Sequence, residues 1–187
     1  YMFHTPNIDI TKLQAEAIGI PMVRAVTEGV KEEELEDLKC AIKQAKEKYR
    51  IEGIVTGAIE SVYQSRRIQK ICDDLNLVCI NPLWKKDQKK LLEELVNSGY
   101  DIMISGIFAY PMDERWLGKH LDKKMITELV RLNEKYQISP VGEGGEIETT
   151  VLDAPFFKKK IKVNSYEIKA EKNSGILIIN DAELAEK

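Results

Sequence analysis

The segment IEGIVTG, residues 51–57, is the stretch that indicates the fold class, because it is a short apolar run that ends in glycine. Such a run is typical of a strand that is buried on both faces of a parallel sheet. The pattern returns at residues 77–80 (LVCI) and at residues 101–106 (DIMISG), with helical segments between the runs. This alternation predicts an α/β fold, in which right-handed crossovers connect the strands of a parallel sheet.

Helices are predicted where apolar residues recur every three or four positions. Residues 31–49 show this pattern most clearly, since Leu35, Leu38 and Ile42 share one face and Lys and Glu fill the others. The predicted helices span residues 11–18, 31–49, 62–75, 87–98 and 122–136. Further strands are expected at residues 1–6 and 21–26, and the tail alternates like a β-hairpin that turns at residues 173–175.

A polar and aromatic segment after residue 106 breaks the alternation of strand and helix. We therefore place a domain boundary between residues 110 and 111. Residues 1–110 are expected to form the α/β domain, and residues 111–187 a smaller α+β domain that is richer in strands.

The composition excludes several classes of protein. Hydrophobic residues make up 43% of the 187 residues and charged residues 32%, as in an ordinary globular protein, and a net charge of −3 gives no basic surface for nucleic acid. No apolar run reaches the roughly 18 residues of a membrane span, and no signal peptide is visible. Cys40, Cys72 and Cys79 lack the paired spacing of a zinc site, so we interpret them as packing residues in a reduced, cytoplasmic setting.

Two glycines follow apolar runs and indicate a ligand crevice. Gly57 and Gly106 would each lie at the carboxyl end of a strand, and open α/β sheets bind ligands outside these ends. Glycine there lets a ligand approach the main chain, although a tight turn would need a glycine as well. Ser61 suits the N-cap of the next helix, and a helix N-terminus can also hold phosphate.

Residues 142–150, GEGGEIETT, place three glycines and three glutamates in one short window that reads as neither a helix nor a regular strand. Acids this close repel one another unless a metal, a donor-rich substrate or their own backbone amides bind them. A solvated acidic turn is the simple alternative. The residues alone leave these interpretations open.

Six short strings stand out when they are taken in order. They are FHTPN at residues 3–7, GAI-x-S-x-YQ-x-x-R at 57–67, PLW at 82–84, DE-x-WLG at 113–118, GEGGE-x-ET at 142–149 and LDAP at 152–155. In this order they resemble the diphthine–ammonia ligase family, especially its archaeal members. The combination is specific, whereas a single string such as PLW is not.

The resemblance implies an ATP-pyrophosphatase (PP-loop) fold of the adenine-nucleotide α-hydrolase type, a Rossmann-like parallel sheet with helices on both faces, followed by a smaller substrate domain. It also implies a reaction. ATP, together with Mg²⁺, would adenylate the carboxylate of diphthine on translation elongation factor two, and ammonia would displace AMP to give diphthamide. The implied partners are the elongation factor and ammonium, without nucleic acid or membrane, and a homodimer stays open.

The resemblance also implies site residues. Those expected to bind the nucleotide are His4, Gly57, Ala58, Ser61, Tyr63, Gln64 and Arg67. The catalytic candidates, which would grip the trimethylammonium group of diphthine, deprotonate ammonium or hold magnesium with the phosphates, are Glu143, Glu146 and Glu148. The other residues expected to bind the substrate are Asp113, Trp116, Gly144, Gly145 and Thr149. No site in which protein side chains alone hold a metal is expected.

Several of these residues have a structural alternative. His4 lies beside a strand, where a lone histidine is often structural. Tyr63, Gln64 and Arg67 could serve helix packing instead, and Asp113 and Trp116 could clamp a domain junction.

One family string, the phosphate-gripping S-G-G-x-D-S, does not occur in the sequence. By the family's order it would precede Tyr1, so we expect the N-terminal strand, phosphate loop and first helix to be missing from this sequence. Two other functions therefore stay open. One is another PP-loop adenylating enzyme, such as one that modifies tRNA, and the other is an inactive module that binds nucleotide or elongation factor.

Overall fold

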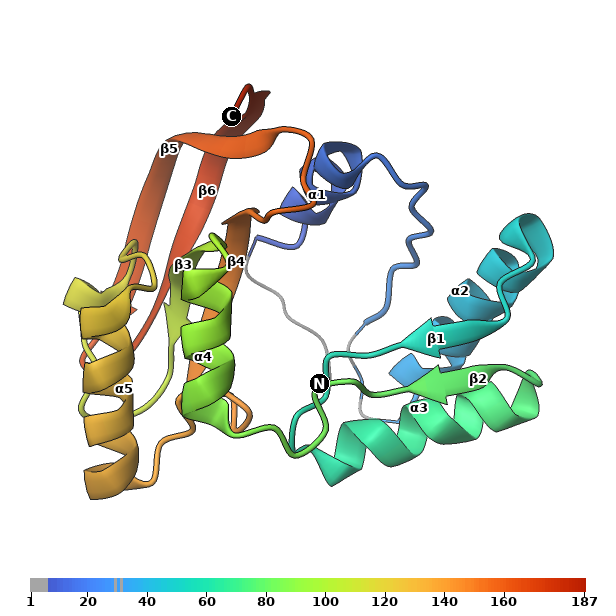
Figure 1. Cartoon of the computed structure of the whole chain (residues 1–187), viewed down its shortest axis with the longest axis horizontal. Helices are drawn as coiled ribbons and strands as arrows, with labels where there is room; N and C mark the ends of the chain where they lie inside the picture. The colour runs from blue at the N-terminus through green and yellow to red at the C-terminus, as the bar shows by residue number, and fades with distance from the viewer. Residues whose placement is uncertain (1–6, 29, 31) are drawn as a thin grey trace. The chain divides into compact units, whose positions relative to one another are not determined.

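The computed structural model describes residues 7–28, 30 and 32–187, which form two compact units (Figure 1). Residues 22–86 belong to the first unit, and residues 7–21 and 87–187 belong to the second. The units meet in the chain at residues 86 and 87, whereas the sequence placed a boundary between residues 110 and 111. The difference arises because residues 101–106 had been assigned to the parallel sheet.

The first unit is built on two parallel strands. β1 (Gly53–Val55) pairs with β2 (Val78–Ile80), and α2 (Glu34–Tyr49) and α3 (Val62–Asp74) supply the helices. The buried residues of its small core are Ile42, Ile71, Cys72 and Leu77. The predicted α/β class and the parallel pairing are confirmed.

The helices of this unit cover one face of the strand pair. Ile54 and Cys79 are partly buried against the core on that face. Their strand neighbours point the other way, because successive residues of a strand face opposite sides. On that second face Val55 is 68% exposed, Val78 60% and Ile80 49%. Within the described residues of this unit, the expected helices therefore lie on one face of the sheet only.

The cysteines of this unit differ in environment. Cys72 is buried and Cys79 is partly buried, which confirms packing roles for these two residues. Cys40 is exposed on α2, so its predicted packing role is wrong. Its apolar neighbours Leu38 and Ile42 lie on the face that meets the core, and Cys40 lies outside that stripe.

The second unit is built on an antiparallel sheet in the order β4-β3-β6-β5. The strands are β3 (Asp101–Ile107), β4 (Ile147–Asp153), β5 (Lys160–Glu171) and β6 (Ser174–Ala185). β5 and β6 form the predicted hairpin. β3 is antiparallel to both of its neighbours, so its prediction as a third parallel strand is wrong. Its apolar run correctly indicates burial on both faces, but burial does not reveal strand direction.

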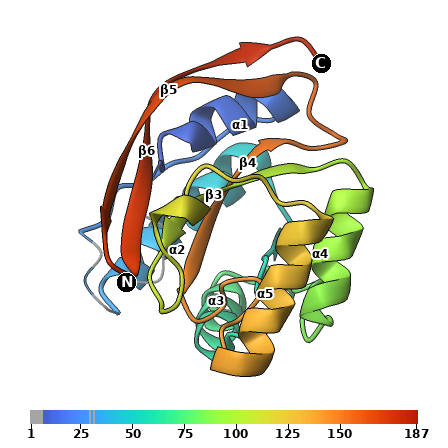
Figure 2. The same cartoon turned by 90° about the vertical axis from the view of Figure 1, so that its left-hand side faces the viewer.

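The α-helices described in the second unit are α1 (Ile10–Ile18), α4 (Gln88–Asn97) and α5 (Lys123–Tyr136). α4 and α5 lie side by side, and α1 packs along the β5–β6 hairpin (Figure 2). Two hydrogen bonds also connect α1 to β4 and to the segment before β5: Gln14 Nε2 donates to Val151 O over 2.9 Å, and Lys158 N donates to Ala17 O over 2.7 Å. An early segment of the chain thus completes the core of the later unit.

The helices predicted from sequence are confirmed within a few residues of their ends. The strand predicted at residues 21–26 is absent, and Val26 in this segment is 85% exposed. The strand end expected at residues 1–6 lies outside the described residues. The end of the GEGGEIETT window is regular, since residues 147–150 belong to β4. None of the helices in the described ranges is long and apolar enough to cross a membrane.

Candidate functional site

The carboxyl ends of β1 and β2 meet at one edge, as the sequence predicts. Thr56 follows β1, and its N–H donates to the carbonyl oxygen of Ile80 over 3.0 Å. The hydroxyl of Thr56 donates to Oδ1 of Asn81, which follows β2. Thr56 and Asn81 were not predicted as site residues, although both are polar residues directly after apolar strands. They join the two strand ends across which a ligand would lie.

Gly57, Ala58 and Ser61 lie just beyond this edge. A Cβ on Gly57 would meet no atom within 4 Å, so the main chain there is open to a ligand, while Ala58 is buried. Oγ of Ser61 accepts the N–H of Gln64 over 3.3 Å and caps the 13-residue helix α3. The predicted N-cap is confirmed. The N-terminus of α3 carries partial positive charge beside the strand ends, as an anion site requires.

Tyr63 and Arg67 are bound to an acid that sequence reasoning missed. The guanidinium of Arg67 lies 3.4 Å from the ring centre of Tyr63, and its Nε donates to Oε1 of Glu32 over 3.0 Å. The hydroxyl of Tyr63 donates to the same oxygen over 3.1 Å. Burial, together with the bond to Glu32, raises the pKa of Tyr63. These contacts are compatible with the structural alternative for Tyr63 and Arg67, and nucleotide binding by these two residues stays a prediction. Gln64 contributes its backbone N–H to the cap at Ser61, and a role of its side chain in nucleotide binding stays a prediction. His4 lies outside the described residues.

Glu146 binds the main chain of its own loop. Its Oε1 accepts the N–H of Ser139 over 3.2 Å, and its Oε2 accepts the N–H of Gly144 over 3.0 Å. Oγ of Ser139 accepts the N–H of Glu143 over 3.0 Å and donates to Oε1 of Gln88 over 2.9 Å. This carboxylate therefore meets backbone amides, one of the three kinds of partner that the sequence left open. Ser139 and Gln88 were not predicted, and neither stands in a recognisable motif.

The glycines shape this acidic loop, residues 139–146. Gly142 and Gly145 have φ of +74° and +80°, in the left-handed region that side chains disfavour. A Cβ on Gly142 would lie 2.4 Å from the carbonyl oxygen of Ile147, whereas a Cβ on Gly145 would meet nothing within 4 Å. A Cβ on Gly144 would meet the carboxylate of Glu146 at 2.6 Å. The loop accordingly requires glycine where the family string has it.

Glu148 and Thr149 lie on β4. Glu148 stands opposite Gly106 of β3, and Thr149 stands opposite Ile104 with its side chain exposed. The N–H of Phe108 donates to the carbonyl oxygen of Glu146 over 2.8 Å, which brings the end of β3 next to the acidic loop. Phe108 was not predicted, although it directly follows Ile107, the last residue of β3. Gly106 lies inside β3, which is antiparallel to its neighbours, so its predicted place at the carboxyl end of a parallel strand is wrong.

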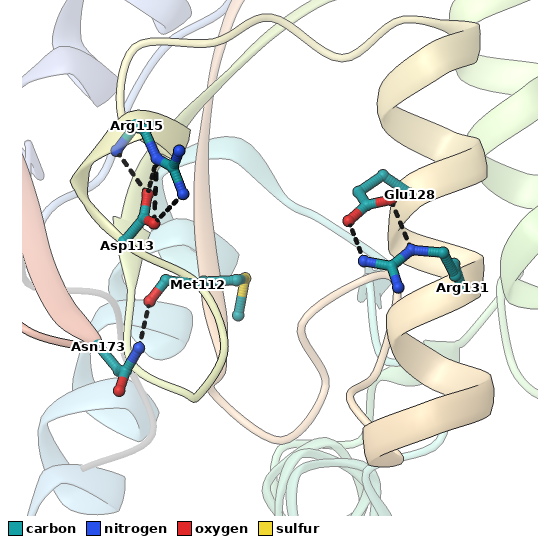
Figure 3. Close-up of polar contacts among 6 residues, drawn as sticks. All are labelled: Met112, Asp113, Arg115, Glu128, Arg131 and Asn173. Carbon is teal, nitrogen blue, oxygen red and sulfur yellow. Dashed lines mark hydrogen bonds and ion pairs between the residues drawn. The ribbon is translucent and has the colours of Figure 1, made fainter.

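Asp113 is held by Arg115, as Figure 3 shows. Oδ1 of Asp113 accepts the backbone N–H of Arg115 over 3.0 Å and so caps the short 3₁₀ helix η1 (Glu114–Trp116). Oδ2 accepts Nη2 of the same arginine over 2.6 Å. The side-chain bond to Arg115 lowers the pKa of Asp113. The structure therefore gives this carboxylate a local capping role.

Trp116 lines a cavity of about 510 Å³ with Lys119, His120, Met125 and Glu128 among its neighbours. Nζ of Lys119 lies 5.9 Å from the centre of the indole ring. Figure 3 shows Glu128 paired with Arg131 on α5, through bonds of 2.8 and 2.6 Å. The cavity borders the N-terminal half of α5, whereas the acidic loop follows the other end of this helix. The structure does not bring Trp116 to the acidic loop.

The predicted residues thus fall into separate groups. Gly57, Ala58 and Ser61 gather at the edge of the parallel strands in the first unit. The acidic loop and β4 gather the second group, namely Glu143, Gly144, Gly145, Glu146, Glu148 and Thr149. Asp113 and Trp116 have partners of their own in the second unit.

Comparison with known proteins accounts for both units. Residues 1–79 match the model of the diphthamide synthase N-terminal domain, and residues 87–185 match that of the diphthamide synthase C-terminal domain. A human protein named diphthine–ammonia ligase is 39% identical over 180 residues, which cover 90% of this chain and 67% of the human protein.

Relatives from other organisms carry the same name. The protein of Danio rerio is 37% identical over 179 residues, covering 89% of this chain and 70% of its own length. That of Schizosaccharomyces pombe is 36% identical over 187 residues, covering 94% of this chain but 30% of its own length. Two domain matches in the family's order, on a fold with a parallel α/β unit and an antiparallel unit, show that this chain belongs to the diphthamide synthase family.

Proposed function

We propose that the protein is an ATP-dependent ligase that amidates diphthine to diphthamide on translation elongation factor two, in a cytoplasmic setting. The observation that carries this proposal is the match of both units, in order, to the two diphthamide synthase domains. The relatives named diphthine–ammonia ligase support it, because the name states the substrate and the nitrogen donor. The net charge of −3 argues against a tRNA substrate.

ATP would bind at the carboxyl edge of β1 and β2. The open main chain at Gly57 and the capped N-terminus of α3 at Ser61 fit a nucleotide with its phosphates. In the described part of the chain, no three His, Cys, Asp or Glu side chains converge as a metal site. Magnesium would then be held largely by phosphate oxygens and water, which is common for this ion.

The reaction would proceed in two steps, adenylation of the carboxylate and then formation of the amide. A carboxylate oxygen of diphthine attacks the α-phosphorus of ATP, a new P–O bond forms, and the bond to pyrophosphate breaks. The lone pair of ammonia then attacks the acyl carbon, the C–O bond to AMP breaks, and one proton leaves the nitrogen. The residues for the second step are those of the acidic loop and β4, where Glu143 and Glu148 are the candidates to take that proton.

The test uses the full-length protein from the parent gene with diphthine-bearing elongation factor, ATP and ammonium. AMP release together with the mass change of amidation would support the ligase. AMP release without amidation would indicate another acceptor, and tRNA would then be tried. A folded protein that releases no AMP would instead support a binding module.

The variant Glu146→Gln tests the role of the acidic loop. We expect it to impair amidation while ATP binding stays nearly intact, because the carboxylate holds the loop and ATP binds elsewhere in the proposal. Unchanged turnover would remove the loop from the site.

A further inference from the structure

Two side chains meet over the bare backbone of Gly106. A Cβ placed on this glycine would lie 2.9 Å from Cε2 of Phe108 and 3.1 Å from Cβ of Glu148. The ring of Phe108 therefore folds back over the strand that precedes it, on the side where Glu148 leaves β4. Glycine is the residue that allows this approach, because any side chain at position 106 would fill the space.

The aromatic ring is accessible, and its position is fixed. Phe108 is 42% exposed, while its N–H is bound to the carbonyl oxygen of Glu146 over 2.8 Å. Glu148 is held in register opposite Gly106, and its Oε2 is buried. An exposed ring and the base of the Glu148 side chain thus lie side by side over Gly106, next to the loop that the proposed function uses.

This chemistry suits a permanent cation. Quaternary ammonium groups bind over aromatic faces within about 6 Å of the ring centre, because the ring presents negative charge. A neighbouring carboxylate adds attraction, and its partial burial strengthens that attraction. We propose that Phe108 and Glu148 form a subsite for a quaternary ammonium group, which, on the basis of the proposed function, is the trimethylammonium group of diphthine.

The subsite replaces the predicted role of Trp116. The indole of Trp116 already has Lys119 as a neighbour and borders the opposite end of α5 from the acidic loop. Phe108, by contrast, has a hydrogen bond from its N–H to that loop. The subsite also separates three glutamates by task. Glu148 attracts the cation, Glu146 holds the loop, and Glu143 is then the candidate that takes the proton in the second step of the proposed reaction.

The first experiment measures binding without catalysis. Tetramethylammonium chloride is titrated into the full-length protein with ¹³C-labelled phenylalanine, and ring signals are followed by NMR, with sodium chloride as the ionic control. We expect a saturable shift of the Phe108 signal that Glu148→Gln weakens. A shift equal to that with sodium chloride would overturn the subsite.

The second experiment compares amidation of elongation factor whose diphthine carries three methyl groups with that of the unmethylated precursor. Phe108→Ala should raise KM for the trimethylated factor by about tenfold, the order of one strong cation–π contact, and leave KM for ATP unchanged. Phe108→Trp should restore binding. Gly106→Ala should act like Phe108→Ala, because its methyl group displaces the ring.

Tyr110→Ala is the matched control. Tyr110 is an aromatic residue two positions away, 64% exposed and packed edge-on against Tyr136 at 5.3 Å, and its loss should leave both values of KM unchanged. If Phe108→Ala raises KM equally for both forms of the factor, the ring serves packing and the subsite is wrong. If the wild-type enzyme amidates neither form, the proposed function fails, and the NMR titration still decides the subsite.

Discussion

At the scale of single residues, three glutamates of one short window have three different surroundings. The carboxylate of Glu146 accepts two backbone N–H groups of its own loop, while Glu148 stands on β4 opposite a glycine. Glu143 enters the network through its backbone, whose N–H binds Ser139. Identical side chains in one string therefore cannot be assigned one role from the string alone.

The role of Glu146 can be measured by amide hydrogen exchange. Glu146→Ala should speed exchange at Ser139 and Gly144 by about tenfold or more, because hydrogen bonds to a charged group contribute about 1.5–3 kcal/mol. Glu146→Gln should have an intermediate effect, since an amide has one acceptor oxygen in place of two. Glu143→Ala serves as the control and should leave both amides protected. Equal exchange in all four proteins would contradict the assignment.

The two left-handed glycines of the loop form a matched pair. Gly145→Ala should lower the free energy of unfolding by about 1 kcal/mol, the cost of a left-handed residue with a Cβ. Gly142→Ala should lower it by at least about 2 kcal/mol, because its methyl group also collides with the carbonyl of Ile147. Urea unfolding of both variants measures the difference. Equal losses would mean that the loop relaxes away from the contact.

Cys72 gives a pH prediction. Burial, aided by the charge of Cys79, raises the pKa of the Cys72 thiol to about 11. The folded state thus favours the protonated thiol, and this contribution to stability is present below the unfolded pKa and is lost as pH rises through about 11. Since the thiolate is the nucleophile, iodoacetamide at pH 8–9 should alkylate exposed Cys40 and spare Cys72. Peptide mass analysis checks this, and early labelling of Cys72 would contradict it.

At the scale of elements, the start of α3 combines a structural role with a proposed functional one. Ser61 caps a helix whose N-terminus lies just after the edge of the parallel strands. A cap and a phosphate ligand use the same helix end, so the sequence signal for one is also the signal for the other. Separating them requires a residue that caps equally well but repels phosphate.

Aspartate at position 61 meets this requirement. Ser61→Ala should lower the free energy of unfolding by about 1 kcal/mol, whereas Ser61→Asp should keep it, because aspartate is an equally good cap. The added charge of Ser61→Asp should nevertheless weaken ATP binding in the full-length protein. Thermal unfolding and an ATP titration of both variants measure this. Unchanged ATP affinity in Ser61→Asp would leave Ser61 as a cap alone.

At the scale of the whole molecule, the described residues form two hydrophobic cores with no residue in common. Ile71 belongs to the core of the first unit, whereas Leu132 of α5 belongs to the core of the second. Each side chain is buried, so its truncation to alanine should cost about 2–5 kcal/mol in its own core. The question is whether each loss stays within its unit.

We expect each substitution to destabilise its own unit and to leave the other unit unchanged. Ile71→Ala should open Cys72 to iodoacetamide while the amides of α5 keep their protection from exchange. Leu132→Ala should do the reverse. Alkylation of Cys72 and amide exchange of α5 are measured on the same samples. If either variant increased both the alkylation and the exchange, the two cores would unfold as one cooperative unit.

The sequence by itself determined the helices, because an apolar stripe at helical spacing needs only local information, as in α2 and α5. It also determined the family, the cap at Ser61 and the glycines of the acidic loop. Tertiary structure decided the strand direction, which a local sequence pattern does not encode. A run such as DIMISG is equally apolar in a parallel or an antiparallel sheet, so the direction of β3 depended on its partners β4 and β6.

The site shows the same division. The sequence predicted many of the candidate site residues, but several of their contacts come from distant segments of the chain. Glu32 binds Arg67, and Glu148 of β4 meets the ring of Phe108 over Gly106. The string DE-x-WLG predicted that Trp116 binds the substrate with the acids, yet Trp116 lines a cavity beside α5, whereas Phe108 is bound to the acidic loop. The sequence determined which groups the protein has available, and the packing of its elements decided which of them meet.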